Sequence, residues 1–241
     1  MRKVFVVLDV ETIGDARKVF DVGWIVCDSK GRELERFNAC VAEVVNTPWG
    51  KREIAADAFT RRKLADGTRK SDWYLDSLAN GTLPVWSFGA IRSKFIDLAD
   101  KYHAHVVLTA YNSAFDVPAL DASAEVYGLG EFLPKRDKRF SECDLMHVAI
   151  ATICNNRKYA GWATANGFVT ERGSIRTNAE TVFAYLTGNL GFEERHTALA
   201  DCEIEREIFV AARKRKRKVT PSRAIPVGGC KEWRELQSKR P

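Results

Sequence analysis

The stretch KVFVVLDVET, residues 3–12, decides the fold expected of this chain. It opens with an apolar run, which is typical of a strand buried on both faces. Asp9 and Glu11 then stand two residues apart, and residues at that spacing project to the same side of a strand. Two carboxylates that point together repel each other unless a cation holds them, and Mg²⁺ takes oxygen ligands of this kind. Alone, the D-x-E pattern is common and usually marks only a solvated strand end.

Two further strands are expected directly after this one. The segments VFDVGWIVCD (19–28) and RELERFNACVAEV (32–44) are joined by the turn DSKG, so they must be antiparallel. Residues 46–104 are expected to be mostly helical, with Ser87 as the cap of an amphipathic helix. A buried strand, HVVLTAY, follows, and the helix that begins at Asn112-Ser113 carries Pro118 in its first turn.

The second half of the chain is predicted to be mainly helical. Helices are expected over 143–154, over 179–188 with Gly188 at the end, and from about Thr197 to Arg213. Between the first two of these helices, FVTERGSIRT is typical of a β-hairpin that turns at Arg172-Gly173. The element order β-β-β-α-β-α followed by helices predicts an α/β fold. Its central sheet is mixed, with three antiparallel strands plus parallel strands, and helices flank it.

Length and composition fit one globular domain with a basic tail. The chain has 241 residues, of which 45% are hydrophobic, so a core can form without disulfides. No apolar run approaches the roughly 18 residues that span a bilayer, and the run of five before Asp9 is too short for a secretion signal. The six cysteines lack metal-binding spacing, which predicts reduced thiols in a cytoplasmic protein.

The charge is distributed unevenly along the chain. Residues 213–241 contain eleven basic and two acidic side chains, so this tail has a net charge of +9. The whole chain has a net charge of +6, so residues 1–212 carry −3. We therefore expect a domain over 1–212 and a basic tail over 213–241 that is disordered or loosely docked. Six consecutive basic residues open the tail, and they attract phosphates without reading sequence. A nuclear localisation signal and a solvated helix end are the competing interpretations of this run.

Two later segments hold further candidate residues. Asp116 lies in AYNSAFDVPAL, near the start of a helix that follows a buried strand, where a carboxylate also stabilises the helix dipole. His196 and Asp201 lie in RHTALADCEIE, and five residues correspond to about 140° around a helix. They can face one site only if His196 lies in the loop before the helix. Each segment alone favours a structural interpretation.

Together, the three segments match a known pattern. D-x-E-T at Asp9 and Glu11, N-x-x-F-D ending at Asp116, and H-x-A-L-x-D from His196 to Asp201 resemble the three motifs of the DEDDh branch of the DnaQ-like exonuclease family. That family includes proofreading exonucleases, oligoribonuclease and ribonuclease T. The resemblance spans residues 5 to about 212 and implies a ribonuclease H-like fold.

The sequence departs from the family pattern in two places. Tyr111 stands where many members have histidine, and residues 155–178 resemble an insertion, which we expect to contain the hairpin. Neither change touches the five motif positions. A substrate assigned to a particular subfamily therefore does not transfer to this chain.

The resemblance implies a metal-dependent 3′→5′ exonuclease that releases 5′-nucleoside monophosphates. Two Mg²⁺ or Mn²⁺ ions about 4 Å apart are expected. Asp9 would bridge both ions, Glu11 and Asp201 would complete the first site, and Asp116 would hold the second ion, through water. His196 would take a proton from the attacking water, since its intrinsic pKa is near neutral.

The same match suggests which residues contact the substrate. Thr12 and Phe115 are candidates for binding the 3′-terminal nucleotide, and Asn112 supports the loop that carries Asp116. For Phe115, core packing is an equally good explanation. Aromatic and basic side chains of the insertion are candidates for stacking on single-stranded bases, although packing against the body is an equal alternative: Trp162, Phe168 and Arg172.

The natural substrate and partners stay open at this stage. Single-stranded DNA is the expected substrate, and an RNA-trimming enzyme similar to oligoribonuclease or ribonuclease T is the first alternative. A catalytically silent nucleic-acid-binding module is the second, although such modules are expected to lose a metal carboxylate or the histidine. No docking peptide for a polymerase or a sliding clamp is recognisable in the tail, so coupling to replication or repair would need a partner that the sequence does not identify. No membrane partner is expected.

Overall fold

A six-stranded mixed sheet forms the centre of the molecule, in the order β4-β3-β2-β1-β5-β6. The computed structural model describes residues 2–58, 60–64, 66–134 and 136–215. Three strands, β1 (Lys3–Ile13), β2 (Lys18–Cys27) and β3 (Glu33–Val41), pair antiparallel. The other three, β4 (Val85–Trp86), β5 (His105–Ala110) and β6 (Phe140–Asp144), pair parallel to their neighbours.

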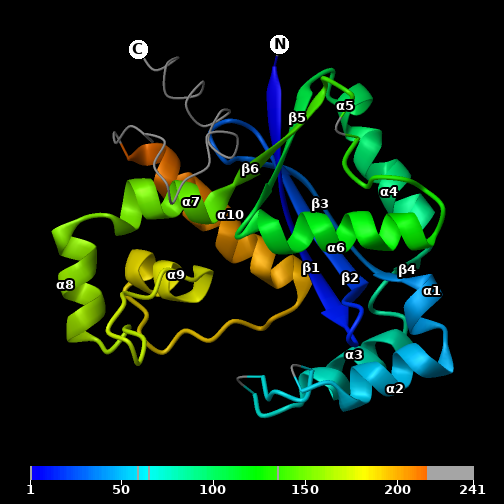
Figure 1. The fold of residues 1–241 in the computed structure, drawn as a ribbon, viewed down its shortest axis with the longest axis horizontal. Coiled ribbons are helices and arrows are strands. Elements are labelled where there is room, and N and C mark those ends of the chain that lie inside the picture. Colours follow the sequence, from blue (N-terminus) through cyan, green and yellow to red (C-terminus); the bar gives the residue numbers. More distant parts are fainter. Residues whose placement is uncertain (1, 59, 65, 135, 216–241) are drawn as a thin grey trace.

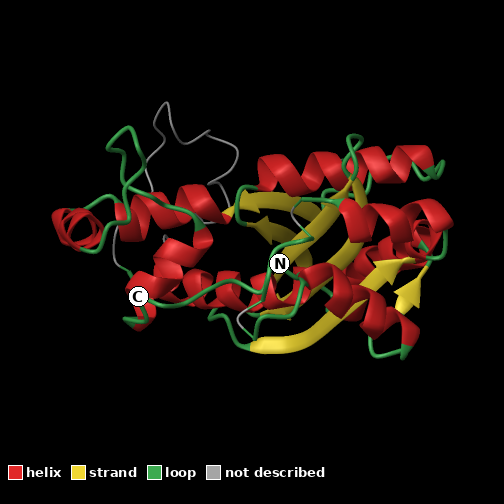
Figure 2. Cartoon of the chain, turned by 90° about the horizontal axis from the view of Figure 1, so that it is seen from below, coloured by secondary structure: helices red, strands yellow, loops and turns green. Residues whose placement is uncertain are grey.

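Helices cover both faces of this sheet (Figures 1 and 2). Those before β6 are α1 (Ala42–Val45), α2 (Pro48–Ala56), α3 (Lys70–Ala79), α4 (Phe88–Ile96), α5 (Leu98–Lys101) and α6 (Ser113–Val126). Those after β6 are α7 (Leu145–Ala149), the π-helical turn η1 (Ile150–Cys154), α8 (Arg157–Ala165), α9 (Ala179–Thr187) and α10 (Ala198–Lys214).

The central strand β1 separates two hydrophobic clusters. Its even-numbered residues, such as Val6 and Leu8, pack with α4 and α6, whereas Phe5 and Val7 pack with α9 and α10 on the other face. All four side chains are fully buried, as expected for a strand inside a sheet covered on both faces. This alternation also determines that odd-numbered residues further along β1 face α10.

Most of the expected elements are confirmed. The first three strands, the antiparallel pairing and the buried strand at 105–110 are present. Ser87 caps α4 by accepting a hydrogen bond from the amide of Ala90, and Gly188 ends α9 in the left-handed conformation at φ 75°. The last helix begins after Thr197, as predicted.

Three local predictions are wrong. The third strand ends at Val41, and the residues expected to continue it form the helical turn α1. Pro118 lies beyond the first turn, because α6 already begins at Ser113, so the ring leaves the carbonyl of Ala114 without an intrahelical donor. Residues 143–154 are not one helix, because Cys143 and Asp144 complete β6, which pairs parallel to β5.

The region 155–178 is only partly a hairpin. It begins with α8, and a single antiparallel bridge then joins Val169 to Ile175 around a turn that contains Gly173 at φ 77°. The rings of Trp162 and Phe168 stack on each other at 5.0 Å and belong to the cluster beneath α9 and α10. Their mutual packing supports the structural interpretation of both side chains over base stacking.

The remaining predictions concern the cysteines, the membrane and the tail. The cysteines at 27, 40, 143, 154 and 202 are buried and form no disulfide; Cys230 lies outside the described residues. No described helix is both long and apolar enough to cross a membrane. The prediction for the basic tail concerns residues that lie mostly outside the described part, which ends at Arg215.

Candidate active site

The first two carboxylates are positioned where β1 runs beyond its parallel neighbour. The pairing with β5 ends at Val7, opposite Thr109, while the pairing with β2 continues through Glu11. Near Asp9 and Glu11, β5 therefore leaves one edge of β1 uncovered, and side chains from other elements can reach it. As alternation along the strand predicts, both acids project to the face that α10 covers.

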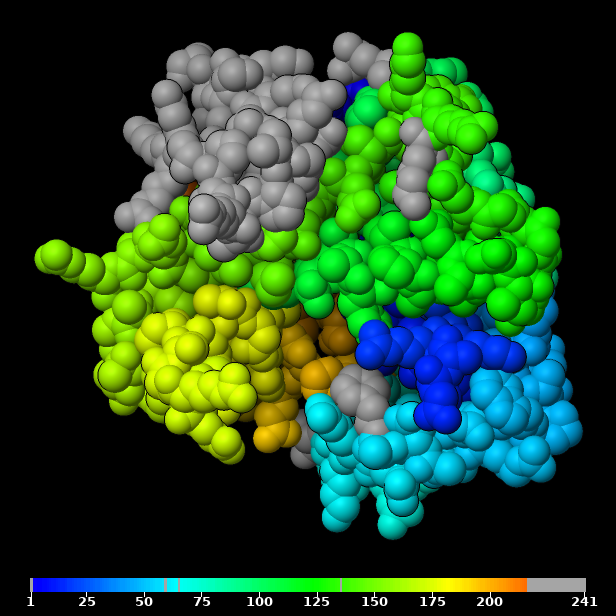
Figure 3. Space-filling view, viewed as in Figure 1, coloured from blue at the N-terminus to red at the C-terminus, as the bar shows by residue number. Residues whose placement is uncertain are grey.

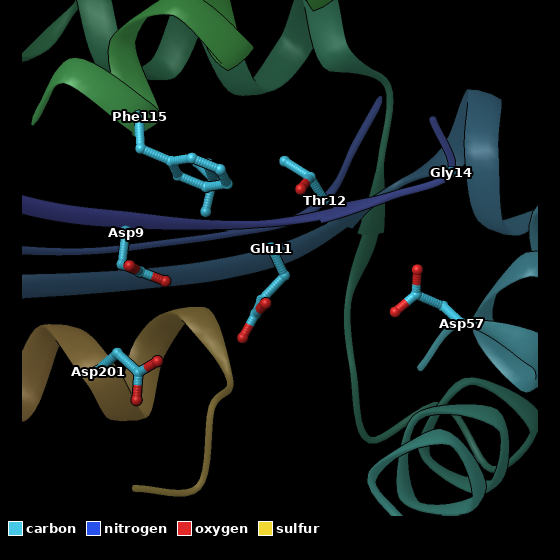
Figure 4. A pocket seen from close by; sticks show the side chains of 8 residues that line it. Asp9, Glu11, Thr12, Gly14, Asp57, Phe115 and Asp201 are labelled. Atoms are coloured by element: carbon cyan, nitrogen blue, oxygen red, sulfur yellow. The ribbon is translucent and has the colours of Figure 1, made fainter. Parts of the chain in front are cut away.

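Asp201 meets this pair from the first turn of α10. One carboxylate oxygen from each of Asp9, Glu11 and Asp201 lies within 4.8 Å of the others. Figure 4 shows the three carboxylates directed into the same space, with Asp9 and Glu11 on β1 and Asp201 across from them. The sequence prediction that these three residues converge agrees with this arrangement.

Two residues of β2 bring α10 this close. A Cβ atom on Gly23 would lie 2.5 Å from the backbone nitrogen of Leu199, so only glycine allows the helix to touch the strand here. The buried carboxylate of Asp21 accepts a hydrogen bond from the amide of Ala198, the first residue of α10, at 3.2 Å. Asp21 also accepts from the Tyr74 hydroxyl at 2.6 Å, which fixes the carboxylate in turn.

Asp116 approaches β1 from the opposite face, at the start of α6. Its carboxylate accepts the amide hydrogen of Val10 at 3.3 Å, on the stretch of β1 that β5 does not cover. Asn112, with φ 71°, precedes the helix and accepts the amide of Phe115 through its carbonyl, so it shapes the turn that presents Asp116. Asp116 therefore contacts β1 at Val10, the residue between Asp9 and Glu11 in the sequence.

The cluster is strongly destabilised as a set of bare anions. Burial raises the pKa of Asp9 well above its usual value, and the nearby Asp116 and Asp201 raise it further. Burial, together with Glu11 and Glu194, raises the pKa of Asp201 to about 9. The pKa of Asp116 is raised to about 7, again mainly by burial.

These carboxylates fit a divalent cation. Among the described residues, Oδ1 of Asp201 is a buried oxygen without a hydrogen-bond partner. Convergent carboxylate oxygens are the ligands that Mg²⁺ and Mn²⁺ prefer. An added positive charge would also relieve the repulsion that raises the pKa values of the acids.

His196 lies in the segment immediately before α10, as the sequence predicted. Its backbone is left-handed, at φ 51°, and Nδ1 lies 3.5 Å from Glu194 and 4.0 Å from Asp201. Burial, followed by the charges of Lys70 and Arg62, lowers the pKa of the imidazole to about 4. A histidine with this pKa is neutral at pH 7 and able to accept a proton.

Sequence reasoning missed three charged residues around the cluster. Lys70, the first residue of α3, donates from Nζ to Glu11 at 2.7 Å, and both side chains are buried. Glu205 is buried one turn after Asp201 and accepts the amide of Tyr111 at 3.2 Å. Helical spacing of four could have revealed Glu205, and proximity in sequence could have revealed Glu194. No local pattern connects Lys70 to Glu11.

A cleft of about 340 Å³ opens over the carboxylates. Thr12 and Phe115, the two residues expected to contact the substrate, line it together with Gly14 and Asp57. Figure 4 shows Phe115 reaching in from α6, on the opposite side of β1 from Asp201. In the space-filling view, a hollow lies between the yellow, green and blue parts of the chain, with orange residues of α10 at its base (Figure 3).

No protein-family model and no curated protein matches this chain. Solved structures do match. Exonuclease I in its apo form is 16% identical, with a TM-score of 0.57 over 89% of this chain and 43% of its own length. E. coli exonuclease I in complex with a dA16 oligonucleotide is 17% identical, with a TM-score of 0.55 over 89% of this chain and 41% of its own.

A third similar structure concerns RNA. It describes recognition of a histone mRNA stem-loop by a 3′-exonuclease, and it is 12% identical with a TM-score of 0.53 over 88% of this chain and 64% of its own. This chain thus spans less than two thirds of the length of each of the three proteins. At these identities the similarity is one of fold: the chain has the ribonuclease H-like mixed sheet flanked by helices that these exonucleases share.

Proposed function

We propose that this chain is a metal-dependent exonuclease that removes nucleotides from the 3′ end of a single strand and releases 5′-nucleoside monophosphates. The observation that carries the proposal is the convergence of Asp9, Glu11 and Asp201 within 4.8 Å, with His196 beside Asp201. Buried carboxylates this close together repel one another and destabilise the fold unless cations bind them, so their presence indicates chemistry that uses cations. The fold it shares with exonucleases supports the same reaction class.

The four acids would hold two Mg²⁺ or Mn²⁺ ions, Asp9 contributing to both, Glu11 and Asp201 to the first and Asp116 to the second. Divalent ions in such a site lower the pKa of water and neutralise charge on a leaving oxygen. His196, neutral at pH 7, would accept the proton of the attacking water. Glu194, 3.5 Å from Nδ1, orients the imidazole.

Two residues would position the terminal nucleotide in the cleft. Thr12 lies on β1 directly after Glu11, at an irregularity in the pairing with β2. In the view of Figure 4, Phe115 lies above Asp9. The guanidinium of Arg17 lies over its ring, 5.4 Å from the ring centroid. A partly exposed ring at the wall of the cleft offers a surface on which the last base can stack.

We propose single-stranded DNA as the substrate, with RNA as the alternative. The similar structures contain examples of both, namely exonuclease I with a DNA oligonucleotide and a 3′-exonuclease with a histone mRNA stem-loop. A catalytically silent binding module is the weaker alternative, because silent members would be expected to lose a metal carboxylate or the histidine, and all five residues are present here.

The decisive experiment is digestion of 5′-labelled DNA and RNA, single- and double-stranded, by the pure protein with Mg²⁺ or Mn²⁺. The expected product is a ladder that shortens from the 3′ end and disappears in EDTA. Asp9→Asn is the matched control, because it keeps the size of the side chain and removes its charge. Equal digestion by wild type and Asp9→Asn, or cleavage that starts inside the strand, would contradict the proposal.

A further inference from the structure

Four exposed basic residues lie in the segment between α2 and α3, which follows the cleft-lining residue Asp57. Arg61, Arg62, Lys63 and Arg69 fall within nine residues between α2 and α3, and we call them the basic patch. Residues 1–212 carry a net charge of −3, so this concentration of positive charge runs against the rest of the domain. Their positions are defined by the backbone that carries them.

Backbone hydrogen bonds hold this segment in one arrangement. The amide of Ser71 donates to the carbonyl of Thr60 at 2.7 Å, and the amide of Lys70 donates to the carbonyl of Arg62 at 2.9 Å. Lys63 and Arg69 form an antiparallel bridge. The basic side chains are therefore displayed from a ladder of paired backbone rather than from an unpaired loop.

Lys70 attaches this ladder to the active site. Its backbone pairs with Arg62, while its side chain is buried and donates to Glu11 at 2.7 Å. One residue thus joins the carboxylate cluster to the basic patch. Asp57, which comes just before the patch in the chain, lines the cleft.

The segment before α10, which contains Arg195 and His196, lies near the basic patch. Arg62 is one of the cations that lower the pKa of His196, after burial and Lys70. Hydrogen bonds from Thr68, and then the charge of Arg195, lower the pKa of Asp66, which lies between the patch residues in sequence. Figure 3 shows the cyan residues of this region beside the orange residues of the α10 segment.

We propose that the basic patch binds the phosphates of the nucleotides that lie on the 5′ side of the scissile bond, and so guides the single strand into the cleft. The inference rests on the proposed function, because it assumes that a 3′ end occupies the cleft. Acids that repel a polyanion surround the metal site, so affinity for the strand must come from cationic side chains outside it. The patch supplies such side chains on the segment that Lys70 joins to Glu11.

Phosphates are common to DNA and RNA, so the patch would contact both. Contacts of this kind add affinity, set no sequence preference and weaken as salt rises. Discrimination between ribose and deoxyribose would then fall to residues inside the cleft, such as Thr12 and Phe115.

The test compares two triple variants in oligonucleotide binding. The first variant combines three substitutions in the basic patch: Arg61→Gln, Arg62→Gln and Lys63→Gln. The matched control removes three exposed basic residues elsewhere: Lys30→Gln, Arg136→Gln and Lys158→Gln. Lys30 follows the end of β2 that pairs with the beginning of β1. Arg136 precedes β6, whose first residues pair through β5 with the same end of β1. Both control residues are therefore at the opposite end of β1 from Asp9 and Glu11. Binding of labelled dT12 and rU12 is measured in EDTA at several salt concentrations.

The first variant is expected to bind both oligonucleotides at least tenfold more weakly at low salt. Its slope of log affinity against log salt should fall by about 2, since each phosphate contact to a single strand contributes about 0.7. The control variant should stay within twofold of wild type. A third variant, Arg61→Lys with Arg62→Lys, keeps the charge and should retain the slope, which separates lost charge from misfolding.

Outcomes of this experiment and of the digestion assay are separable, because binding in EDTA needs no hydrolysis. Equal affinity and slope in the first variant and wild type, or an equal loss in the control, would overturn the role of the basic patch even if the protein digests nucleic acid. Loss of binding by the first variant alone would support it, even if the digestion assay refuted the exonuclease.

Discussion

The ammonium group of Lys70 lies 2.7 Å from the carboxylate of Glu11, and the two side chains are 1% and 7% exposed. A buried ion pair of this kind is costly to break, because removing one partner leaves the other as an unpaired buried charge. Burial still raises the pKa of Glu11 to about 7, with Lys70 acting against that rise. Lys70 therefore supplies a positive charge that is hydrogen-bonded directly to the carboxylate cluster.

Substitution of Lys70 should destabilise the metal-free protein. We expect Lys70→Met to lower the free energy of unfolding in EDTA by about 3–5 kcal/mol at pH 8, the usual cost of breaking a buried pair. Mg²⁺ should restore more stability to this variant than to wild type, since the cation replaces the lost charge. Urea denaturation with and without Mg²⁺ measures both effects. Lys51→Met, on an exposed lysine, is the control, and an equal denaturation midpoint in the two variants in EDTA would disprove the expectation.

The stability of the metal-free protein should fall as pH rises from 6.5 to 8.5. The folded pKa values of Asp201, Glu11 and Asp116 lie at about 9, 7 and 7, above their ordinary values of 3.8, 4.5 and 3.8. The folded state therefore binds more protons than the unfolded state in this window, and raising the pH removes that advantage. The lowered pKa of His196 acts in the opposite direction, but only below its ordinary value of 6.5.

The expected loss from Asp201 alone is on the order of 2–3 kcal/mol over those two pH units. Chemical denaturation in EDTA at pH 6.5, 7.5 and 8.5 measures it. In Mg²⁺ the decline should be much smaller, because the cation binds the ionised carboxylates. A denaturation midpoint that rises with pH in EDTA would contradict this assignment of charge.

Loss of the imidazole should affect turnover more than binding. His196→Asn is preferred to alanine because the residue has φ 51°, a conformation that asparagine tolerates. We expect kcat to fall by about 10²- to 10⁴-fold, the range for removing a general base, with little change in oligonucleotide affinity. The matched variant is His103→Asn, an exposed histidine at φ 46°. Turnover unchanged in His196→Asn would eliminate the histidine as the base.

The close approach of α10 to β2 should depend on Gly23. In Gly23→Ala the new methyl group would meet the backbone of Leu199 at 2.5 Å, so α10 must shift and carry Asp201 away from Asp9. We expect a loss of about 1–3 kcal/mol in stability and a larger loss of Mg²⁺ affinity. Calorimetric Mg²⁺ titration checks the second effect.

Gly161→Ala provides the comparison for this variant. Gly161 lies inside α8, and a Cβ there has open space around it. Alanine in a helix is more favourable than glycine by about 0.5–1 kcal/mol, so this variant should be as stable as wild type or more so. If Gly23→Ala bound Mg²⁺ as tightly as Gly161→Ala, the contact with α10 would not position Asp201.

Several features of the site were predictable because they depend on local backbone geometry. Alternation along β1 places Asp9 and Glu11 on one face. A spacing of five residues within one helix would keep His196 off the face of Asp201, so the sequence predicted His196 in the segment before the helix, where it lies. The short strand β6 was missed, since the apolar run after it dominated the pattern and a parallel edge strand has no turn to mark it. Residues 42–44 were likewise assigned to the preceding strand, although they belong to α1.

The sequence by itself determined the buried central strand, its paired carboxylates, the order of the elements and the three motifs, because each of these is written in residues close together along the chain. Only the tertiary structure decided that Lys70 bonds Glu11, that Asp21 and Gly23 dock α10, and that Glu205 joins the cluster. Lys70 and Glu11, for example, are 59 residues apart. Contacts at such separations depend on how whole elements pack, and no local periodicity encodes that packing.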